Sequence, residues 1–244
     1  MSKKIIDERC TLYVSSCDKY SDLWEPFFIL FKKYWPDCPY PIVLTSESKT
    51  FSFPGLDIHC PRYYKPGDRV SWGQLNMRTL QDVKTPFVFF MLEDFLLEGP
   101  VNQAEISKAL DWIADDPEVG RFQFSNGVHE PSEKYPSYHL APDWDNYRIN
   151  AQPAIWRKSV LLKSMVPKEG PWMWEINGSK RSRKWQGILL YNYHERMLKI
   201  PFDGALFHGK WHDDGINPIV DNGIPMDFSK RGIVRSRKSR AVTK

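Results

Sequence analysis

The sequence of 244 residues has few cysteines and no long apolar run. Its four cysteines show no C-x-x-C spacing, which gives no sign of a zinc site or of a disulfide framework (Cys10, Cys17, Cys38 and Cys60). No stretch reaches the roughly 18 uninterrupted apolar residues of a membrane-spanning helix. The segment Met1–Lys4 leads into polar residues, whereas a signal peptide continues with an apolar run of about 7–15 residues. We therefore expect a cytoplasmic protein whose cysteines are buried thiols.

An excess of basic charge is also missing from most of the chain, although the net charge is +4. Residues 229–244 hold seven basic residues and no acidic one, and the rest of the chain has 27 Lys and Arg against 30 Asp and Glu. A nucleic-acid-binding domain normally carries its basic excess on the folded body, so we expect no nucleic-acid partner. We predict one domain over residues 1–228 and a disordered basic tail over 229–244. The tail is either solvated or in weak contact with an anionic membrane surface.

Strand and helix patterns alternate along the chain. Runs rich in β-branched and aromatic residues predict strands at 11–16, 42–45, 56–60, 87–92 and 121–125. Apolar residues at helical spacing predict helices that begin after Ser21-Asp22 and after Ser71, where these side chains are suited to capping. The same spacing predicts helices at 102–114 and 156–165. With no internal repeat and no linker, this order predicts a single α/β sandwich domain rather than a helical bundle or a barrel.

The most apolar run of the sequence, Phe87–Leu92, ends abruptly in Glu93-Asp94. Six apolar residues without alternation indicate a strand that is buried on both faces of a sheet. Ligands of open α/β sheets bind outside the carboxyl ends of strands. Carboxylates held there bind hard divalent cations, which in turn hold diphosphates. Two interpretations remain open: Glu93-Asp94 forms such a metal site, or it only opens a turn.

Three segments together resemble glycosyltransferases with the A-type fold, particularly small bacterial enzymes of surface-polysaccharide synthesis. They are Ser15-Ser16-Cys17-Asp18, Ser71-Trp72-Gly73-Gln74-Leu75 and Leu92-Glu93-Asp94-Phe95. The resemblance covers residues 10–211. It implies a Rossmann-like, three-layer α/β sandwich with a mixed central sheet. It also implies a nucleotide-sugar donor, a saccharide acceptor and a divalent metal, Mn²⁺ or Mg²⁺, although some enzymes of this fold work without metal.

The resemblance also implies roles for individual residues. In that fold the acids after the central strand form a D-x-D-type motif that binds the metal and the ribose-diphosphate. Here the two acids are adjacent, so Asp94 becomes the metal ligand and Glu93 a ribose or sugar contact, with the reverse assignment left open. His208 either completes the metal shell or is an ordinary hydrogen-bonded histidine, and most of the basic patch at 180–184 is equally well a solvated helix face. The other donor contacts implied are Ser16, Asp18, Tyr20, Trp72, Arg181 and Lys210.

The segment Pro171-Trp172-Met173-Trp174-Glu175 places an acid directly after two tryptophans. An inverting sugar transfer needs a carboxylate that takes the proton from the acceptor hydroxyl. The segment resembles the tryptophan-plus-acid segments of inverting A-type enzymes, which makes Glu175 the predicted base and Trp172 and Trp174 the predicted sugar platforms. The alternative interpretation is an amphipathic helix start whose tryptophans belong to the core.

We therefore predict a nucleotide-sugar-dependent glycosyltransferase, and two rival functions remain. A metal-dependent phosphoesterase or nuclease built on Glu93, Asp94, His208 and Asp213 would need a denser cluster of Asp and His than the sequence offers. A non-catalytic carbohydrate-binding protein would use the tryptophans alone, with the acids in structural roles. Binding of a nucleoside diphosphate separates the transferase from the binding protein.

Overall fold

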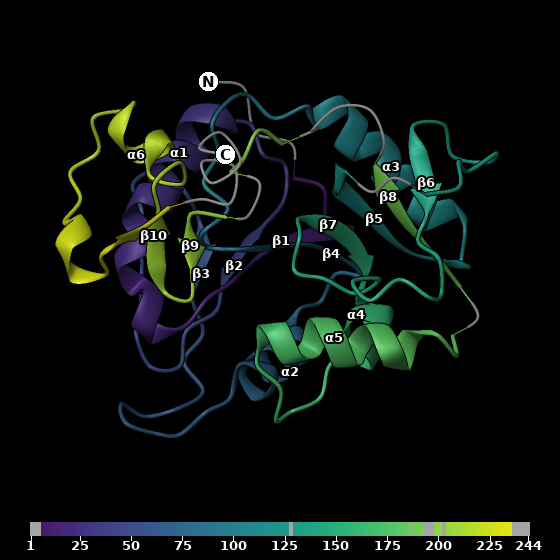
Figure 1. Cartoon of the computed structure of the whole chain (residues 1–244), viewed down its shortest axis with the longest axis horizontal. Coiled ribbons are helices and arrows are strands. Elements are labelled where there is room, and N and C mark those ends of the chain that lie inside the picture. The colour runs from purple at the N-terminus through teal and green to yellow at the C-terminus, as the bar shows by residue number, and fades with distance from the viewer. Residues whose placement is uncertain (1–5, 127–128, 186, 193–197, 202–203, 236–244) are drawn as a thin grey trace.

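The structure, a computed structural model, describes residues 6–126, 129–185, 187–192, 198–201 and 204–235. Its centre is an eight-stranded sheet of order β3-β2-β1-β4-β7-β5-β8-β6 (Figure 1). Strand β7 is antiparallel to both of its neighbours and β6 is antiparallel to β8, while the other pairs are parallel. The predicted mixed sheet is thus confirmed. The strands are β1 Cys10–Ser15, β2 Ile42–Leu44, β3 Ile58–His59, β4 Phe87–Leu92, β5 Val119–Asn126, β6 Tyr138–Leu140, β7 Ala154–Arg157 and β8 Ile188–Asn192.

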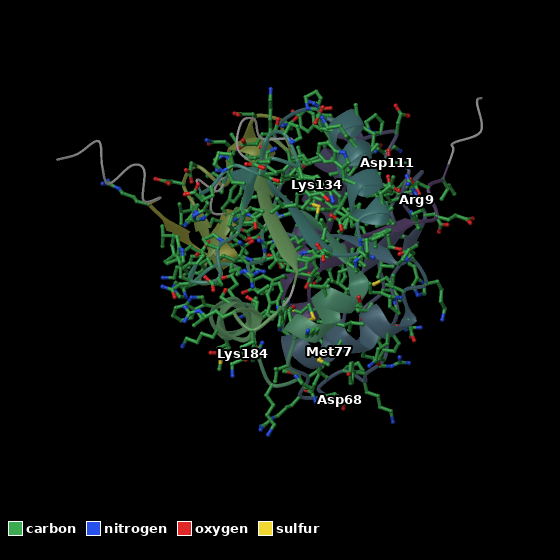
Figure 2. All side chains as sticks on the ribbon, turned by 90° about the vertical axis from the view of Figure 1, so that its right-hand side faces the viewer. Arg9, Asp68, Met77, Asp111, Lys134 and Lys184 are labelled. Carbon is green, nitrogen blue, oxygen red and sulfur yellow. The ribbon has the colours of Figure 1, made fainter. Side chains whose placement is uncertain are left out.

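Helices cover both faces of this sheet and complete the three layers. Helices α1 (Trp24–Tyr34) and α3 (Gln103–Asp115) pack on one face, and Arg9 beside β1 forms an ion pair of 2.8 Å with Asp111 of α3 (Figure 2). Helices α2 (Trp72–Asp82), α4 (Lys158–Ser164) and α5 (Pro171–Ser182) pack on the other face and lie together in Figure 1. The buried apolar side chains therefore form two cores, one on each side of the sheet.

Strand β4 has the two-sided burial that its sequence predicts. Phe87, Phe89 and Met91 belong to the core under α1 and α3, while Val88 and Phe90 belong to the core under α2, α4 and α5. Side chains of a strand alternate between faces, so an unbroken apolar run supplies both cores at once. This position brings the residues that follow β4 to the middle of one sheet edge.

Side chains cap the starts of α2 and α3, whereas the starts of α1, α4, α5 and α6 have no side-chain cap. Ser71 accepts a hydrogen bond from the Gln74 N–H and forms a full capping box at the start of α2. At the start of α3, the Asn102 side chain accepts a hydrogen bond from the Glu105 N–H. The predicted cap at Asp22 is wrong, because a 3-10 turn over Asp18–Leu23 leads directly into α1 and its N-cap residue is Leu23. The Asp22 carboxylate instead binds Arg231.

The predicted helix at 156–165 is wrong in its first part. Residues Ala154–Arg157 form strand β7, and only Lys158–Ser164 are helical, as α4. Ile155 pairs with Phe89 on one side and with Phe122 on the other. A short apolar run fits a buried strand and a buried helix equally well, so its place between two strands decided the outcome. Strand β6 lies within residues 129–146, a segment rich in Pro, Tyr and Ser whose composition is typical of a loop.

A second, three-stranded sheet contains part of the predicted tail. It consists of β9 (Leu206–Phe207), β10 (Lys210–His212) and β11 (Ile233–Val234), beside the short helix α6 (Asn217–Val220) and a 3-10 turn over Phe228–Lys230. Residues 229–235 thus have a defined place, and the fold extends past the predicted boundary at 228. The reason is pairing over long sequence separation, since β11 binds β10 and Arg231 binds Asp22. Residues 236–244 lie outside the described part of the chain, so contact with an anionic membrane remains a prediction.

Among the described residues, none of the helices combines the length and apolar character needed to cross a membrane.

Candidate active site

Two adjoining cavities lie where β1 and β4 end. The first, which we call the β1 cavity, has a volume of about 440 Å³ and is lined in part by Ser16, Tyr20, Glu47, Trp72, Glu93 and His208. The second, the β5 cavity, has a volume of about 620 Å³ and is lined in part by Gln123, His129, Asp145, Gln152, Glu175 and Tyr191. Asp94 and Trp172 line both cavities. The two cavities therefore adjoin beside Asp94, at the sheet edge where β4 ends.

Glu93 and Asp94 are held in a buried acidic pair. Burial, and next the neighbouring Asp94, raise the pKa of Glu93 well above its ordinary value. Burial also raises the pKa of Asp94 to about 7. The backbone N–H of Leu206 donates to Asp94 Oδ2 at 3.4 Å, and a Cβ on Gly204 (φ +76°) would lie 2.7 Å from that oxygen. Only glycine fits so close an approach at positive φ, so residue 204 leaves the room that the Asp94 carboxylate occupies.

The acidic pair fits a divalent cation. Asp94 Oδ1 is buried and has no hydrogen-bond partner among the described residues. Two adjacent carboxylates that oppose each other's ionisation favour a cation, which relieves the repulsion. Within the described ranges, no three His, Cys, Asp or Glu side chains gather as a metal site. Mg²⁺ is commonly held by one or two carboxylates together with substrate phosphates, and the arrangement matches that pattern.

Glu175 lies in the β5 cavity, on the face of α5 that points to the sheet edge. Its Oε1 accepts a hydrogen bond of 2.8 Å from the Ala151 N–H, which fixes the carboxylate at the cavity wall. Burial raises the pKa of Glu175, and this single hydrogen bond only partly offsets the rise. A half-buried carboxylate of raised basicity beside an open cavity has the properties of a general base.

The two tryptophans before Glu175 have different environments. Trp172 is 62% exposed and lines both cavities, where a ring can stack against a ligand. Trp174 is fully buried, packs on Trp72 with ring centroids 5.2 Å apart, and donates from Nε1 to Ser164 Oγ at 2.9 Å. Trp174 as a sugar platform is therefore wrong, because helical spacing turns the two rings to different sides of α5. Trp172 as a platform remains a prediction.

This difference has a measurable consequence for stability. Trp174→Ala should lower the free energy of unfolding by about 3–5 kcal/mol, because it empties a large volume in a close-packed core. Trp172→Ala is the matched control on the same helix and should change it by no more than about 0.5 kcal/mol. Urea unfolding followed by circular dichroism measures both. Equal losses for the two variants would contradict the assignment of Trp174 to the core and Trp172 to the site.

Of the residues predicted after the first strand, Ser16 and Tyr20 line the β1 cavity, as does Trp72. Ser16 Oγ also accepts a hydrogen bond from Trp24 Nε1 at 2.7 Å. Asp18 does not line either cavity and instead accepts hydrogen bonds from Ser46 and Ser48. Burial acts to raise the pKa of Asp18, but these hydrogen bonds outweigh it and lower the pKa to about 2. We assign Asp18 to the support of the loop after β2 rather than to the ligand.

The three predicted residues of the second half of the chain fall in different places. His208 lies in the turn between β9 and β10 and lines the β1 cavity. Lys210 is exposed on β10 and lines neither cavity. Arg181 also lines neither cavity, because both terminal nitrogens of its guanidinium bind the Glu169 carboxylate. The predicted contact of Arg181 with the diphosphate is thus wrong. Arg181 instead forms an ion pair with Glu169, which lies just before α5.

Sequence reasoning missed one group of polar residues in the β5 cavity. His129 Nε2 lies 3.3 Å from Asp145 Oδ2, and the Tyr191 hydroxyl donates to the same oxygen at 2.8 Å. Beneath them, the buried Arg121 guanidinium packs between the rings of Trp156 and Tyr191. Their sequence spacing carries no motif, since three separate elements supply them. Only the pairing of β5 with β7 and β8 brings them together.

Comparison with known proteins identifies the fold of this chain but not its family. No protein-family model matches the chain, and no curated protein is similar to it in sequence. Its fold resembles the A-type glycosyltransferase TarS of S. aureus (residues 1–349), with a TM-score of 0.53 and 12% identity over 79% of this chain and 60% of that one. This chain thus spans less than two thirds of that protein's length. At this identity the likeness confirms the predicted fold alone.

Two further solved structures show weaker likeness. The mannosyltransferase PcManGT from Pyrobaculum calidifontis, solved with GDP-Man and Mn²⁺, has a TM-score of 0.46 and 14% identity over 77% of this chain and 57% of that one. The 2-C-methyl-D-erythritol 4-phosphate cytidylyltransferase from Thermus thermophilus has a TM-score of 0.48 and 8% identity over 87% of this chain and 98% of that one.

Proposed function

We propose that this chain is a glycosyltransferase that moves a sugar from a nucleotide-sugar donor to a saccharide acceptor. The β1 cavity takes the nucleotide and the β5 cavity takes the acceptor. The observation that carries the proposal is that Asp94 and Trp172 line both cavities while Glu175 lines only the second. A diphosphate held at Asp94 would leave the donor sugar at the junction, facing an acceptor hydroxyl beside Glu175.

The reaction that suits this arrangement is a direct displacement. The acceptor oxygen attacks the anomeric carbon, the bond from that carbon to the diphosphate oxygen breaks, and the nucleoside diphosphate leaves. Glu175 takes the proton of the acceptor hydroxyl as the new glycosidic bond forms, and attack from the opposite side inverts the anomeric centre. Its raised pKa, caused by burial, makes the carboxylate a stronger base than an exposed glutamate.

A divalent cation belongs to the proposal, with Asp94 as its main protein ligand and Glu93 and His208 in the same cavity. When bound, such a cation supplies positive charge that stabilises the leaving diphosphate. The residues of this chain supply the remaining functions. Trp172 offers a face to the sugar, and the burial of Glu93 limits the access of water that would weaken its interaction with a bound group.

A thermal-shift screen with nucleoside mono-, di- and triphosphates, with and without Mn²⁺ or Mg²⁺, tests the proposal. One nucleoside diphosphate should raise the melting temperature by roughly 5–10 °C at about 100 times its dissociation constant, and more with the cation than without it. A nucleotidyltransferase would prefer a triphosphate. A non-catalytic carbohydrate-binding protein would respond to no nucleotide. Either result would overturn the proposal.

A further inference from the structure

Arg231 forms an ion pair with Asp22 and also binds two backbone carbonyls. Its side chain is only 10% exposed. The Nε atom donates to Asp22 Oδ2 at 2.8 Å, and Nη2 donates to Asp22 Oδ1 and, at 3.0 Å, to the Lys19 carbonyl. Nη1 donates to the Gly209 carbonyl at 3.4 Å, and the guanidinium carbon lies 4.7 Å from the centre of the Tyr20 ring. One side chain therefore joins two segments that are far apart in the sequence.

These two segments form adjoining walls of the β1 cavity. Tyr20 lies in the 3-10 turn after β1, Gly209 lies in the turn between β9 and β10, and both line the cavity. Gly209 and the Tyr20 hydroxyl are neighbours in this lining, because a Cβ on Gly209 (φ +77°) would lie 3.5 Å from that hydroxyl, an ordinary van der Waals distance. Arg231 itself does not line the cavity.

The segment that carries Arg231 is itself fixed to one of the walls. The Trp211 N–H donates to the Gly232 carbonyl at 3.0 Å, and Asp213 N–H donates to Val234 at 3.0 Å. Trp211 and Ile233 are partners in the parallel pairing of β10 with β11. The chain from 231 to 234 thus binds the strand that directly follows the Gly209 turn, while the Arg231 side chain reaches across to the other wall.

We propose that Arg231 is a positioning residue for the donor nucleotide. It sets the separation of the Tyr20 and Gly209 walls before the ligand arrives, so nucleotide affinity depends on a residue at the C-terminal end of the fold. A guanidinium suits this role because its planar fork binds both carboxylate oxygens and a backbone carbonyl at once, which a lysine ammonium does not match. Preorganised walls reduce the ordering cost of binding. The inference rests on the proposed function, since it assumes that the β1 cavity takes the nucleotide.

The test compares nucleotide affinity in Arg231→Met, Arg231→Lys and Asp22→Asn with the wild-type chain by calorimetry. The probe is whichever of ADP, CDP, GDP, UDP and dTDP the wild-type chain binds most tightly in the presence of Mn²⁺. Arg231→Met should weaken binding by about tenfold or more, the effect of losing one charge-assisted contact. Arg231→Lys and Asp22→Asn should each give a smaller loss. The Asp22→Asn, Arg231→Met double variant should be no weaker than Arg231→Met, because Arg231→Met already removes the contact that Asp22→Asn breaks.

Arg157→Met is the matched control. Arg157 also braces backbone carbonyls, those of Val119, Ile113 and Asp116, and its guanidinium also lies over an aromatic ring, Phe87, at 5.3 Å. It pairs with the first residue of β4 and so lies at the edge of the sheet away from the cavities. The control should lower the melting temperature without changing the dissociation constant of the nucleotide.

The possible outcomes separate the inference from the function on which it rests. Unchanged affinity in Arg231→Met and Asp22→Asn would overturn the positioning role and leave the proposed function standing. An equal loss of affinity in Arg157→Met would also overturn it, because general destabilisation would then explain the effect. A wild-type chain that binds none of the five diphosphates would overturn both the proposed function and the inference.

Discussion

Replacing Glu175 with glutamine should lower turnover by about 10²–10⁴-fold while leaving donor affinity within about twofold of wild type. Glutamine keeps the size of the side chain and a carbonyl oxygen that can still accept the hydrogen bond from Ala151. It loses only the ability to take a proton from the acceptor. Burial raises the pKa of Glu175 above the ordinary 4.5. As the pH is lowered, wild-type turnover should therefore decline while the pH is still above 4.5, because the carboxylate becomes protonated.

The measurements are sugar transfer to an acceptor and donor affinity by calorimetry. Glu169→Gln is the matched control, since Glu169 precedes the same helix but binds Arg181 and lines neither cavity. It should keep most of the turnover. If Glu175→Gln turns over at the wild-type rate, the base lies elsewhere, and the His129–Asp145 pair of the same cavity is the next group to replace. A collapse of donor affinity would instead assign Glu175 to the nucleotide.

Asp94→Asn should have two opposite effects, loss of the metal-dependent nucleotide binding and a gain in the stability of the ligand-free protein. The folded-state pKa of Asp94 is about 7, above the ordinary 3.8. Folding therefore disfavours the ionised form, so the stability of the protein decreases as pH rises from about 4 to 7 and stays reduced above that range. Asparagine cannot ionise. At pH 8 the variant should melt at least about 2–4 °C above wild type, with the difference shrinking toward pH 4.

Asp116→Asn is the control, and its effect on the melting temperature should have the opposite sign to that of Asp94→Asn. Hydrogen bonds from Lys134 and Tyr135 lower the pKa of Asp116 from 3.8 to about 2. Its ionised form therefore stabilises the fold above about pH 4, and that contribution is lost as pH falls from about 4 to about 2. At neutral pH this variant should melt below wild type. Scanning calorimetry of both variants at pH 4, 6 and 8 measures the effect. An Asp94→Asn protein that melts lower than wild type at pH 8, or that binds the nucleotide and Mn²⁺ as before, would contradict the assignment.

Several elements followed from the sequence because their signals are local. The run Phe87–Leu92 indicated a strand buried on both faces, and it supplies both cores. Ser71 indicated a helix start, and its capping box is complete. Glu93 and Asp94 were expected at a ligand-binding edge because they directly follow β4, and the two cavities meet there. In each case neighbouring residues along the chain contain the whole physical cause.

Other features depended on partners that local patterns do not reveal. The segment 154–157 became a strand because β4 and β5 offer it hydrogen bonds on both sides. Trp172 and Trp174 look equivalent in sequence, and only the packing of α5 exposes one ring and buries the other. The sequence leaves the Arg181 guanidinium free to bind a diphosphate, whereas in the folded chain Glu169 binds it.

The sequence by itself determined the α/β class, the central strand and the acidic pair at its end, because apolar periodicity and capping act between residues a few positions apart. Tertiary structure alone decided which polar side chains share a cavity. His129, Asp145 and Tyr191 meet because three elements converge, and Arg231 reaches Asp22 across 209 residues of sequence. Ion pairs and hydrogen bonds depend on distance in space, and the chain reveals that distance only after the sheet has set the order of its strands.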